Sequence, residues 1–407
     1  MRILHTSDWH LGRSLHGVDL SAAHQAFLDH LVDLADDQQV DAVLVAGDVY
    51  DRAQPPITAV NQLNEALRRL TEKAPVIVTS GNHDSAPRLG FGADLYKDRL
   101  HVRTRAEAVG RPITVPNVRG GEGLYVYALP YLEPDMVRDT LSDQRDEDGQ
   151  RVRLGRSHEA VMTAAMRRVS RDLTNRRAHS TRRVPAVAMA HAFVVGGLAS
   201  ESENDIRVGG VDSVPSGVFA PESDLLDYVA LGHLHGPQRV GAVDGPGPVM
   251  RYSGSPLAFS FSEVHHHKTS VIVDIDDETG AVATELVPAP VTRRLSEVHG
   301  TLEEVLGRGF EAQHDDWARV VVTGQTRPEG LVGQIKEAFP HALAIHFEHE
   351  GGLAAVTGIG AAAALDPLEV VADFVNQMRN APPIESEREV LRRAYERMMR
   401  EGEERSA

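Results

Sequence analysis

The chain has 407 residues, of which 42% are hydrophobic, so it can form two or three domains and bury a full core. It contains no cysteine, which excludes a disulfide framework and fits a reducing cytoplasm. Its formal net charge of −17 argues against strong intrinsic affinity for duplex DNA, because that affinity comes largely from neutralising phosphates with lysine and arginine.

No apolar run approaches the length of a membrane span, so we expect no membrane association. The first strand-like run begins at residue 2, which leaves no space for a signal peptide. We therefore expect a cytoplasmic protein.

Residues 1–285 alternate strand-like and helical patterns, which predicts an α/β layered domain. Five apolar runs are short and nearly uninterrupted, as expected for strands that are covered on both faces. These runs lie at residues 3–4, 42–45, 76–78, 187–189 and 229–231. Helical patterns cover residues 22–36 and 57–73, and further strands are predicted around 251–252 and 271–275.

Each of the five runs ends in a side chain that can bind a metal ion. The endings are Asp8-Trp9-His10, Gly47-Asp48, Gly81-Asn82-His83-Asp84, His191 and Gly232-His233-Leu234-His235. Strand ends that converge on one edge of a sheet form a rigid rim, so we expect these side chains to meet.

The candidate ligands are carboxylate, imidazole and amide groups without a thiolate, which favours a divalent ion such as Mn²⁺ over a structural zinc. They are too many for one small ion but suit two ions that share a bridge, and Asp48, alone at its strand end, is the predicted bridge. Two divalent ions with only Asp8 and Asp48 as carboxylates keep excess positive charge, so they should attract an anionic ester and activate a water between them. The pattern predicts phosphoester hydrolysis.

In this order, the motifs resemble the calcineurin-like metallophosphoesterase superfamily. Purple acid phosphatases in that superfamily place a tyrosine ligand three residues after the bridging aspartate, where this chain has Asp51. Protein Ser/Thr phosphatases resemble residues 47–52 more closely, but they usually end the third motif in glutamate, where this chain has Asp84.

A narrower resemblance, to the SbcD-type nuclease subunits of bacteria, covers most of the chain. It is carried by residues 6–12, 24–28, 45–51, 227–238, 251–256 and 261–263. That family is the bacterial counterpart of the nuclease in the double-strand-break repair complex, and it works with SbcC, an ABC-type ATPase. The resemblance implies a metallophosphoesterase β-sandwich flanked by helices, a small α/β capping domain and a C-terminal helical tail.

The resemblance also assigns the metal ligands. One ion would be held by Asp8, His10, Asp48 and His235, and the other by Asp48, Asn82, His191 and His233. The ions would be Mn²⁺, with Mg²⁺ less active, and would lie about 3.5–4 Å apart around one phosphodiester.

His83 and Asp84 are the catalytic candidates. His83 follows the ligand Asn82 and is the best candidate to stabilise or protonate the leaving oxygen. The alternative for His83 is a hydrogen bond to a ligand without proton transfer.

We expect four parts along the chain: a nuclease domain at 1–285, a capping domain at 286–350 that closes over DNA, a linker at 351–365, and C-terminal helices at 366–407. In the capping domain, helical patterns at 302–306 and 330–338 alternate with strand patterns at 318–322 and 342–347. The linker is rich in glycine and alanine.

The predicted tail carries two amphipathic stripes, formed by Leu368, Val371, Phe374, Val375 and Met378 and by Leu391, Tyr395, Met398 and Met399. Such helices either pack on their own domain or dock on a partner. The resemblance favours docking on the coiled coil of an SbcC-like ATPase.

Three further features are open to more than one interpretation. The arginine-rich stretch 151–183 is interpreted as a solvated helix with a loop rather than a phosphate track. The run His265-His266-His267 is interpreted as a polar turn. The family resemblance and the apolar stripe of Leu63, Leu67 and Leu70 predict a homodimer through the helices after the second and third motifs, although such a stripe is more often core.

Together these features predict a Mn²⁺-dependent DNA nuclease, with exonuclease activity on double-stranded ends and endonuclease activity on hairpins or single strands. It would act in DNA repair and recombination near the nucleoid, as a homodimer within a heterotetramer with an SbcC-like ATPase. One alternative is a metallophosphatase or cyclic-nucleotide phosphodiesterase, but a small ester needs neither cap nor tail. Another is a non-catalytic DNA-repair scaffold, against which the intact ligand set argues.

Overall fold

The computed structural model describes residues 1–96, 98–203, 213–220, 225–241 and 247–349, together with 384, 387, 388 and 390–393. The chain forms two compact units, Met1–Glu348 and His349–Ala407, and nearly all described residues belong to the first. The predicted linker and most of the predicted tail helices lie outside the described residues.

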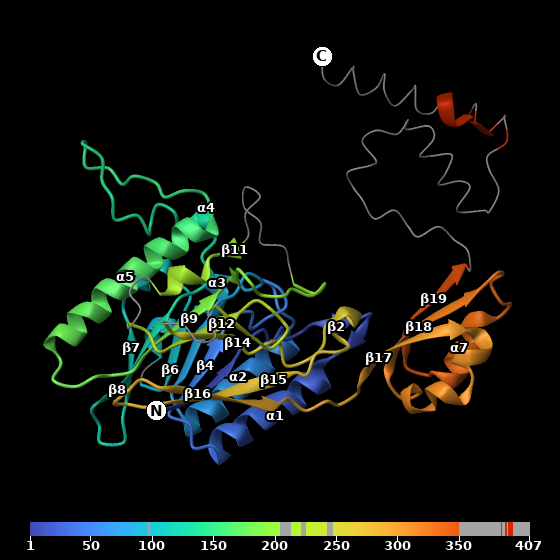
Figure 1. Cartoon of the computed structure of the whole chain (residues 1–407), viewed down its shortest axis with the longest axis horizontal. Helices are drawn as coiled ribbons and strands as arrows, with labels where there is room; N and C mark the ends of the chain where they lie inside the picture. The colour runs from blue at the N-terminus through green and yellow to red at the C-terminus, as the bar shows by residue number, and fades with distance from the viewer. Residues whose placement is uncertain are drawn as a thin grey trace. The chain divides into compact units, whose positions relative to one another are not determined.

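The first sheet has six strands in the order β16-β15-β1-β4-β5-β6, of which β4, β6, β15 and β16 are labelled in Figure 1. Its strands are β1 (Arg2–Thr6), β4 (Ala42–Ala46), β5 (Val76–Thr79), β6 (Leu100–Arg103), β15 (Thr269–Ile275) and β16 (Val282–Pro288). Strands β1, β4, β5 and β6 run parallel, whereas β15 is antiparallel to both β1 and β16. The carboxyl ends of β1, β4 and β5 therefore meet at one edge, where the first three predicted metal-binding motifs begin.

The second sheet has six strands in the order β13-β14-β12-β9-β8-β7. Its strands are β7 (Ile113–Pro116), β8 (Glu122–Ala128), β9 (Ala186–His191), β12 (Tyr228–Gly232), β13 (Gln238–Val240) and β14 (Val249–Tyr252). Neighbours β8, β9, β12 and β14 are parallel, so His191 and the motif after Gly232 leave this sheet side by side.

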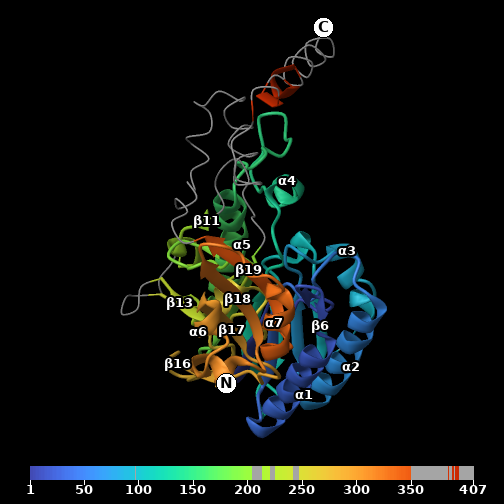
Figure 2. The same cartoon turned by 90° about the vertical axis from the view of Figure 1, so that its right-hand side faces the viewer.

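The two sheets face each other across an apolar core. Buried side chains of the first sheet, such as Leu44 and Ile77, pack with side chains of the second, such as Val187 and Met189. Helices α1 (Ser21–Asp37) and α2 (Ile57–Lys73) lie side by side and pack on the other face of the first sheet (Figure 2). Helix α5 (His158–His179) packs on the other face of the second. The predicted β-sandwich flanked by helices is confirmed.

Shorter elements connect these layers. They are β2 (Ser14–Leu15), β3 (Val18–Asp19), α3 (Ala86–Leu89), α4 (Pro134–Val137), β10 (Phe193–Val194) and β11 (Ser213–Val214), with 3-10 helices η1 (Ala93–Leu95), η2 (Ala106–Ala108), η3 (Ser216–Phe219) and η4 (Phe261–Glu263), whereas η5 (Arg308–Gln313) lies between α6 (Leu302–Val305) and β18 (Trp317–Gly324). The run His265-His266-His267 joins η4 to β15 without regular structure, as predicted.

The smaller sheet near residue 300 has its own core. Strands β17 (Leu295–Thr301), β18 (Trp317–Gly324) and β19 (Ala342–His349) pack with α6 (Leu302–Val305) and α7 (Leu331–Ala338) around Val320, Ile335 and Phe339. The predicted helices and strands between 302 and 347 are confirmed. Strand β17 was not predicted, because its alternating polar residues and glycine resemble a loop.

The prediction that Leu63, Leu67 and Leu70 form a dimer surface is wrong. Leu63 and Leu70 are buried, and Leu67 packs against the same core between α2 and the first sheet. The stripe faces inward because α2 lies along the sheet. Two apolar side chains that follow the third motif, Phe91 and Leu95, are instead 83% and 78% exposed.

The arginine-rich stretch forms α5 and its flanking loops, and many of its arginines pair with acids. Ion pairs join Arg153 to Asp139 at 2.8 Å, Arg156 to Asp135 at 2.6 Å, Arg168 to Asp143 at 2.9 Å and Arg176 to Asp172 at 2.7 Å. This pattern supports the interpretation as a solvated helix.

None of the helices in the described residues is long and apolar enough to cross a membrane.

Candidate metal centre

The loops that carry the first two motifs are held together by their backbones. The amide of Asp8 donates to the carbonyl oxygen of Gly47 at 3.1 Å, and the amide of His10 donates to that of Asp48 at 3.0 Å. Asp8, His10, Asp48 and His233 all have positive φ angles, of 54°, 46°, 47° and 104°. Such conformations cost roughly 1–3 kcal/mol each in a non-glycine residue and cluster at functional sites.

Strand ends approach each other so closely at this rim that a side chain would not fit at several glycines, both within the first sheet, as at Gly81, and between the two sheets, as at Gly232. A Cβ atom on Gly81 would lie 2.1 Å from Oδ1 of Asp48, and one on Gly232 would lie 1.9 Å from the carbonyl oxygen of Ala46. Glycine lacks this atom and therefore lets the strand ends meet backbone to backbone.

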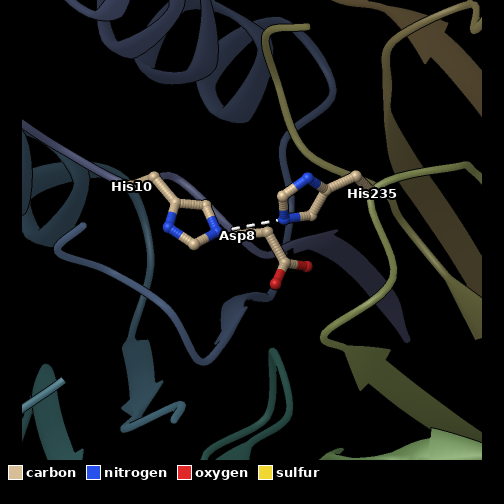
Figure 3. A group of neighbouring side chains, drawn as sticks. All are labelled: Asp8, His10 and His235. Atoms are coloured by element: carbon tan, nitrogen blue, oxygen red, sulfur yellow. Dashed lines mark hydrogen bonds between the residues drawn. The ribbon is translucent and has the colours of Figure 1, made fainter. Parts of the chain in front are cut away.

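Asp8, His10 and His235 form the first group of the site (Figure 3). All three are buried, and each offers one ligand atom within 4.8 Å of the others. The Nε2 atoms of the two imidazoles are 3.1 Å apart. The carboxylate of Asp8 accepts hydrogen bonds from the backbone amide of His233, at 2.9 and 3.2 Å, and from the hydroxyl of Ser7, which hold it in place.

Asn82, His191 and His233 form the second group. Oδ1 of Asn82 is 2.8 Å from Nε2 of His191 and 3.4 Å from Nδ1 of His233. Nδ1 of His191 lies 3.0 Å from the backbone carbonyl oxygen of Ala46, to which it donates. This hydrogen bond orients the ring so that Nε2 faces the site.

Asp48 lies between the two groups. Its Oδ2 atom is 3.6 Å from Nε2 of His10 and 3.4 Å from Nε2 of His191. Its Oδ1 atom accepts the backbone amide of His83 at 2.9 Å. One carboxylate therefore reaches both histidine groups.

Burial and neighbouring charges shift the pKa values of this site in opposite directions. Burial raises the pKa of Asp8 to about 6 and lowers that of His233 to about 3 and that of His10 well below its usual value. Burial alone would raise the pKa of Asp48, but the nearby His191 holds the pKa of this carboxyl well below its usual range. Asp48 in turn raises the pKa of His191 to about 9 against the effect of burial.

This donor set fits a pair of divalent cations. An ionised Asp48 and unprotonated His10 and His233 direct lone pairs into one buried region, and metal binding requires deprotonated ligands of this kind. The structure brings all seven residues predicted as ligands to this rim: Asp8, His10, Asp48, Asn82, His191, His233 and His235.

His83 lies at the edge of the site. Its Nδ1 atom donates to the carbonyl oxygen of Asp51 at 2.7 Å, which turns Nε2 toward Asp48 at 3.9 Å. Its ring also packs edge-on against the ring of His10, with centroids 4.6 Å apart. The predicted catalytic histidine therefore has one nitrogen anchored and the other facing the site.

Asp84 holds the backbone of two motifs together. Its carboxylate accepts the amide hydrogens of Gly81 at 2.9 Å, Val49 at 3.1 Å and Tyr50 at 2.9 Å. Burial, together with the charge of Asp48, raises its pKa to about 6. This geometry favours a positioning role for Asp84 over the predicted catalytic one.

A group of polar residues that was not predicted from the sequence lies behind His235: Ser202, Glu203, Glu263 and Lys268. Glu203 accepts the backbone amide of His235 at 2.7 Å, and Lys268 donates to its carbonyl oxygen at 3.0 Å. Glu263 was part of the resemblance to the SbcD-type family, but nothing in its spacing linked it to a ligand.

Known proteins match this chain over most of its length. Residues 1–237 match the family described as calcineurin-like phosphoesterase, and residues 291–379 match the type 5 capsule protein repressor C-terminal domain. The SbcD subunit of the SbcCD nuclease of Bacillus subtilis (strain 168) is 36% identical over 338 residues, which cover 79% of each chain.

Two solved structures also align with the chain. The protein TT1561 of Thermus thermophilus is 13% identical, with a TM-score of 0.36, over 70% of this chain and 98% of that one. A dimetal phosphatase from Danio rerio is 10% identical, with a TM-score of 0.39, over 71% of this chain and 96% of that one.

The first family match covers more than half of the chain, and the identity to the Bacillus subtilis protein covers 79% of it and so extends beyond that match. The chain therefore belongs to the calcineurin-like phosphoesterase family and, within it, to the SbcD-type nucleases.

Proposed function

We propose that this protein is a Mn²⁺-dependent DNA nuclease that hydrolyses phosphodiester bonds at double-stranded ends and in hairpins or single strands. The observation that carries the proposal is the position of Asp48, whose Oδ2 atom lies within 3.6 Å of one histidine group and 3.4 Å of the other. A carboxylate placed in this way suits a bridge between two ions. The 36% identity to a nuclease subunit supports DNA as the substrate.

We assign one Mn²⁺ to Asp8, His10, His235 and Asp48, and the other to Asp48, Asn82, His191 and His233. Four imidazoles combined with carboxylate and amide oxygens suit Mn²⁺ better than Mg²⁺, which prefers oxygen ligands. When bound, such a pair polarises the phosphoryl oxygens and lowers the pKa of water.

The chain's own residues complete the reaction. The bond from Nδ1 of His83 to Asp51 leaves Nε2 directed at the site, where a proton held on this atom can pass to the leaving oxygen. Asp84 keeps the loop of His83 joined to the loop of Asp48 through its three backbone hydrogen bonds. The buried surroundings of Asp8 and His10 strengthen the field on the ester.

The substrate is tested by incubating the purified chain with labelled linear duplex, hairpin DNA and a small aryl phosphodiester, each with Mn²⁺ or Mg²⁺. We expect cleavage of both DNAs, faster with Mn²⁺. The Asp48→Ala variant serves as the control for contaminating nuclease. Turnover of the aryl ester with both DNAs intact would contradict a DNA nuclease and favour a phosphodiesterase of the same family.

We further propose that the chain works near the nucleoid with an SbcC-like ABC ATPase, which binds the C-terminal helices. The support is the similarity to one subunit of a two-component nuclease and the amphipathic stripes of the tail sequence. Truncation after Gly352 should leave metal binding and thermal unfolding of the nuclease domain nearly unchanged but abolish co-purification with the ATPase. A truncated chain that still binds the ATPase would place the docking surface elsewhere.

The proposed heterotetramer requires that two copies of this chain form a dimer. We place the dimer interface at the exposed side chains Phe91 and Leu95 rather than at the buried leucines of α2. Light scattering at micromolar concentration should give a dimer for the wild type and a monomer for the double change to aspartate. Leu198→Asp is the matched control, since Leu198 is also 78% exposed but lies after β10. A wild-type monomer would refute the proposal.

A further inference from the structure

His235 is held by a closed ring of hydrogen bonds that runs through three other buried residues. Nδ1 of His235 lies 2.5 Å from the hydroxyl oxygen of Ser202, and that hydroxyl donates to Oε1 of Glu263. The ammonium of Lys268 donates to Oε2 of Glu263 and, at 3.0 Å, to the carbonyl oxygen of His235 itself. These hydrogen bonds thus hold both the imidazole and the main chain of His235 in place.

The direction of each hydrogen bond in this network follows from the number of protons that Glu263, Ser202 and His235 carry. Glu263 is ionised, because its Oε2 atom accepts a hydrogen bond from the ammonium group of Lys268, with which it forms a buried ion pair. An ionised carboxylate only accepts, so the single proton of Ser202 points to Glu263. The oxygen of Ser202 must therefore accept from His235, which puts a proton on Nδ1 and leaves the lone pair of Nε2 facing His10.

The pair of Glu263 and Lys268 is difficult to explain by stability alone. Glu263 is 1% exposed and Lys268 is 8% exposed, and taking two opposite charges out of water costs about as much as their attraction returns. Lys268 is nonetheless fully satisfied, since it also donates to the hydroxyl of Ser255 at 2.9 Å. A buried, saturated pair placed directly behind a metal-binding histidine suggests a role at that histidine.

His191, in the other histidine group, is oriented by different means. Its Nδ1 atom donates to the backbone carbonyl oxygen of Ala46 at 3.0 Å, which no side-chain substitution removes. The two halves of the site therefore depend on different partners. A change in the network of Ser202, Glu263 and Lys268 should affect only the half that contains His235.

We propose that Glu263, acting through Ser202 and anchored by Lys268, is the positioning residue that fixes the tautomer of His235 and so sets the affinity of one metal position. The inference rests on the proposed two-metal function. Partners of this kind typically change metal affinity by about 10–100-fold.

The test uses the full chain stripped of metal, with Mn²⁺ binding followed by calorimetry and elemental analysis. Ser202→Val and Ser202→Thr are a matched pair, because valine and threonine have nearly the same shape and only threonine keeps the hydroxyl. We expect two ions in the wild type. In Ser202→Val one ion should bind normally and the other about 10–100-fold more weakly, and Ser202→Thr should restore it.

A spectroscopic signal separates this role from a general loss of structure. The electron paramagnetic resonance spectrum should change from that of a coupled Mn²⁺ pair to that of an isolated ion in Ser202→Val and in Glu263→Gln. If Glu263→Gln fails to fold, the Ser202 pair still decides the question, since it leaves the ion pair of Glu263 and Lys268 intact.

Each remaining outcome counts against one specific statement. Two ions bound with wild-type affinity in Ser202→Val would overturn the inference, and so would equal weakening in Ser202→Val and Ser202→Thr. Loss of both ions in Ser202→Val would also overturn it, because the effect would not be selective. A wild type that binds fewer than two ions would instead contradict the proposed two-metal function.

Discussion

The Nε2 atoms of His10 and His235 face each other across 3.1 Å in the buried interior of the site (Figure 3). Two ring nitrogens at this distance repel unless one carries a proton or a cation lies beside both. Burial lowers the pKa of His10 well below its usual value, so this ring is neutral and keeps one nitrogen free to bind a metal ion. With both Nε2 atoms unprotonated, these two nitrogens and the carboxylate of Asp8 would hold one metal ion.

Metal binding should therefore stabilise the fold. Mn²⁺ added to the metal-stripped chain at about 100 times its dissociation constant should contribute roughly 2.7 kcal/mol per site, since the unfolded chain lacks the assembled ligands. Scanning calorimetry should show a higher Tm, reversed by a chelator. An unchanged Tm in a preparation that cleaves DNA only with Mn²⁺ would place the ions elsewhere.

The Asp48→Ala variant should abolish hydrolysis and weaken both metal positions, because its carboxylate reaches both histidine groups. Elemental analysis and nuclease assays are the measurements, and Asp172→Ala, a change on α5, is the control. More than about a tenth of wild-type activity with both ions still bound would refute the bridging assignment.

His83→Ala should keep both ions but reduce turnover by about 10²–10⁴-fold, the range expected for loss of a proton donor. Nδ1 of His83 already donates a hydrogen bond to the carbonyl oxygen of Asp51, so the ring nitrogen that faces the site is Nε2. Single-turnover assays and metal analysis separate the two roles. Loss of an ion in this variant would move His83 into the ligand set.

Asp84→Ala should act on stability first. It removes the acceptor of three backbone amides, on Gly81, Val49 and Tyr50, and should lower the unfolding free energy by roughly 3 kcal/mol. Urea unfolding of the metal-stripped chain measures this, with His83→Ala as the neighbouring control. An Asp84 variant of wild-type stability that has lost turnover would support the catalytic role predicted from the sequence.

The stability of the metal-stripped chain should decrease as the pH falls from about 6.5 toward 4, in part through His24. Burial lowers the pKa of His24 from 6.5 to about 4, so in this range the unfolded chain binds a proton that the folded chain excludes. The full effect is on the order of 3 kcal/mol.

His24→Asn removes this titration and should reduce the pH dependence, as measured by urea unfolding at pH 7 and pH 5. Asp8 and Asp84, whose pKa values are raised to about 6, act in the opposite sense, but they remain in both proteins and cancel in the comparison. An identical pH dependence in wild type and variant would show that His24 is accessible to protons in the folded chain.

The pattern of the sequence was sufficient to predict that the candidate metal-binding motifs lie together. Buried parallel strands are recognisable as short apolar runs, and their carboxyl ends must meet at one edge, so a ligand after each run predicts a shared site. Asp8, Asp48 and Asn82 follow neighbouring strands of one sheet, and His191 and His233 follow neighbouring strands of the other. Side-chain chemistry then indicates divalent cations.

Only the tertiary structure decided which face of α2 is covered and what holds each ligand. Leu63 and Leu70 have the same spacing whether they meet a sheet or a second chain, and the packing of α2 on the first sheet places them in the core. Ser202 and Glu263 are 33 and 28 residues from His235 along the chain, and no local pattern links them. Local sequence determines where a strand ends, whereas the partners that orient a side chain there come from distant segments and depend on how the layers pack.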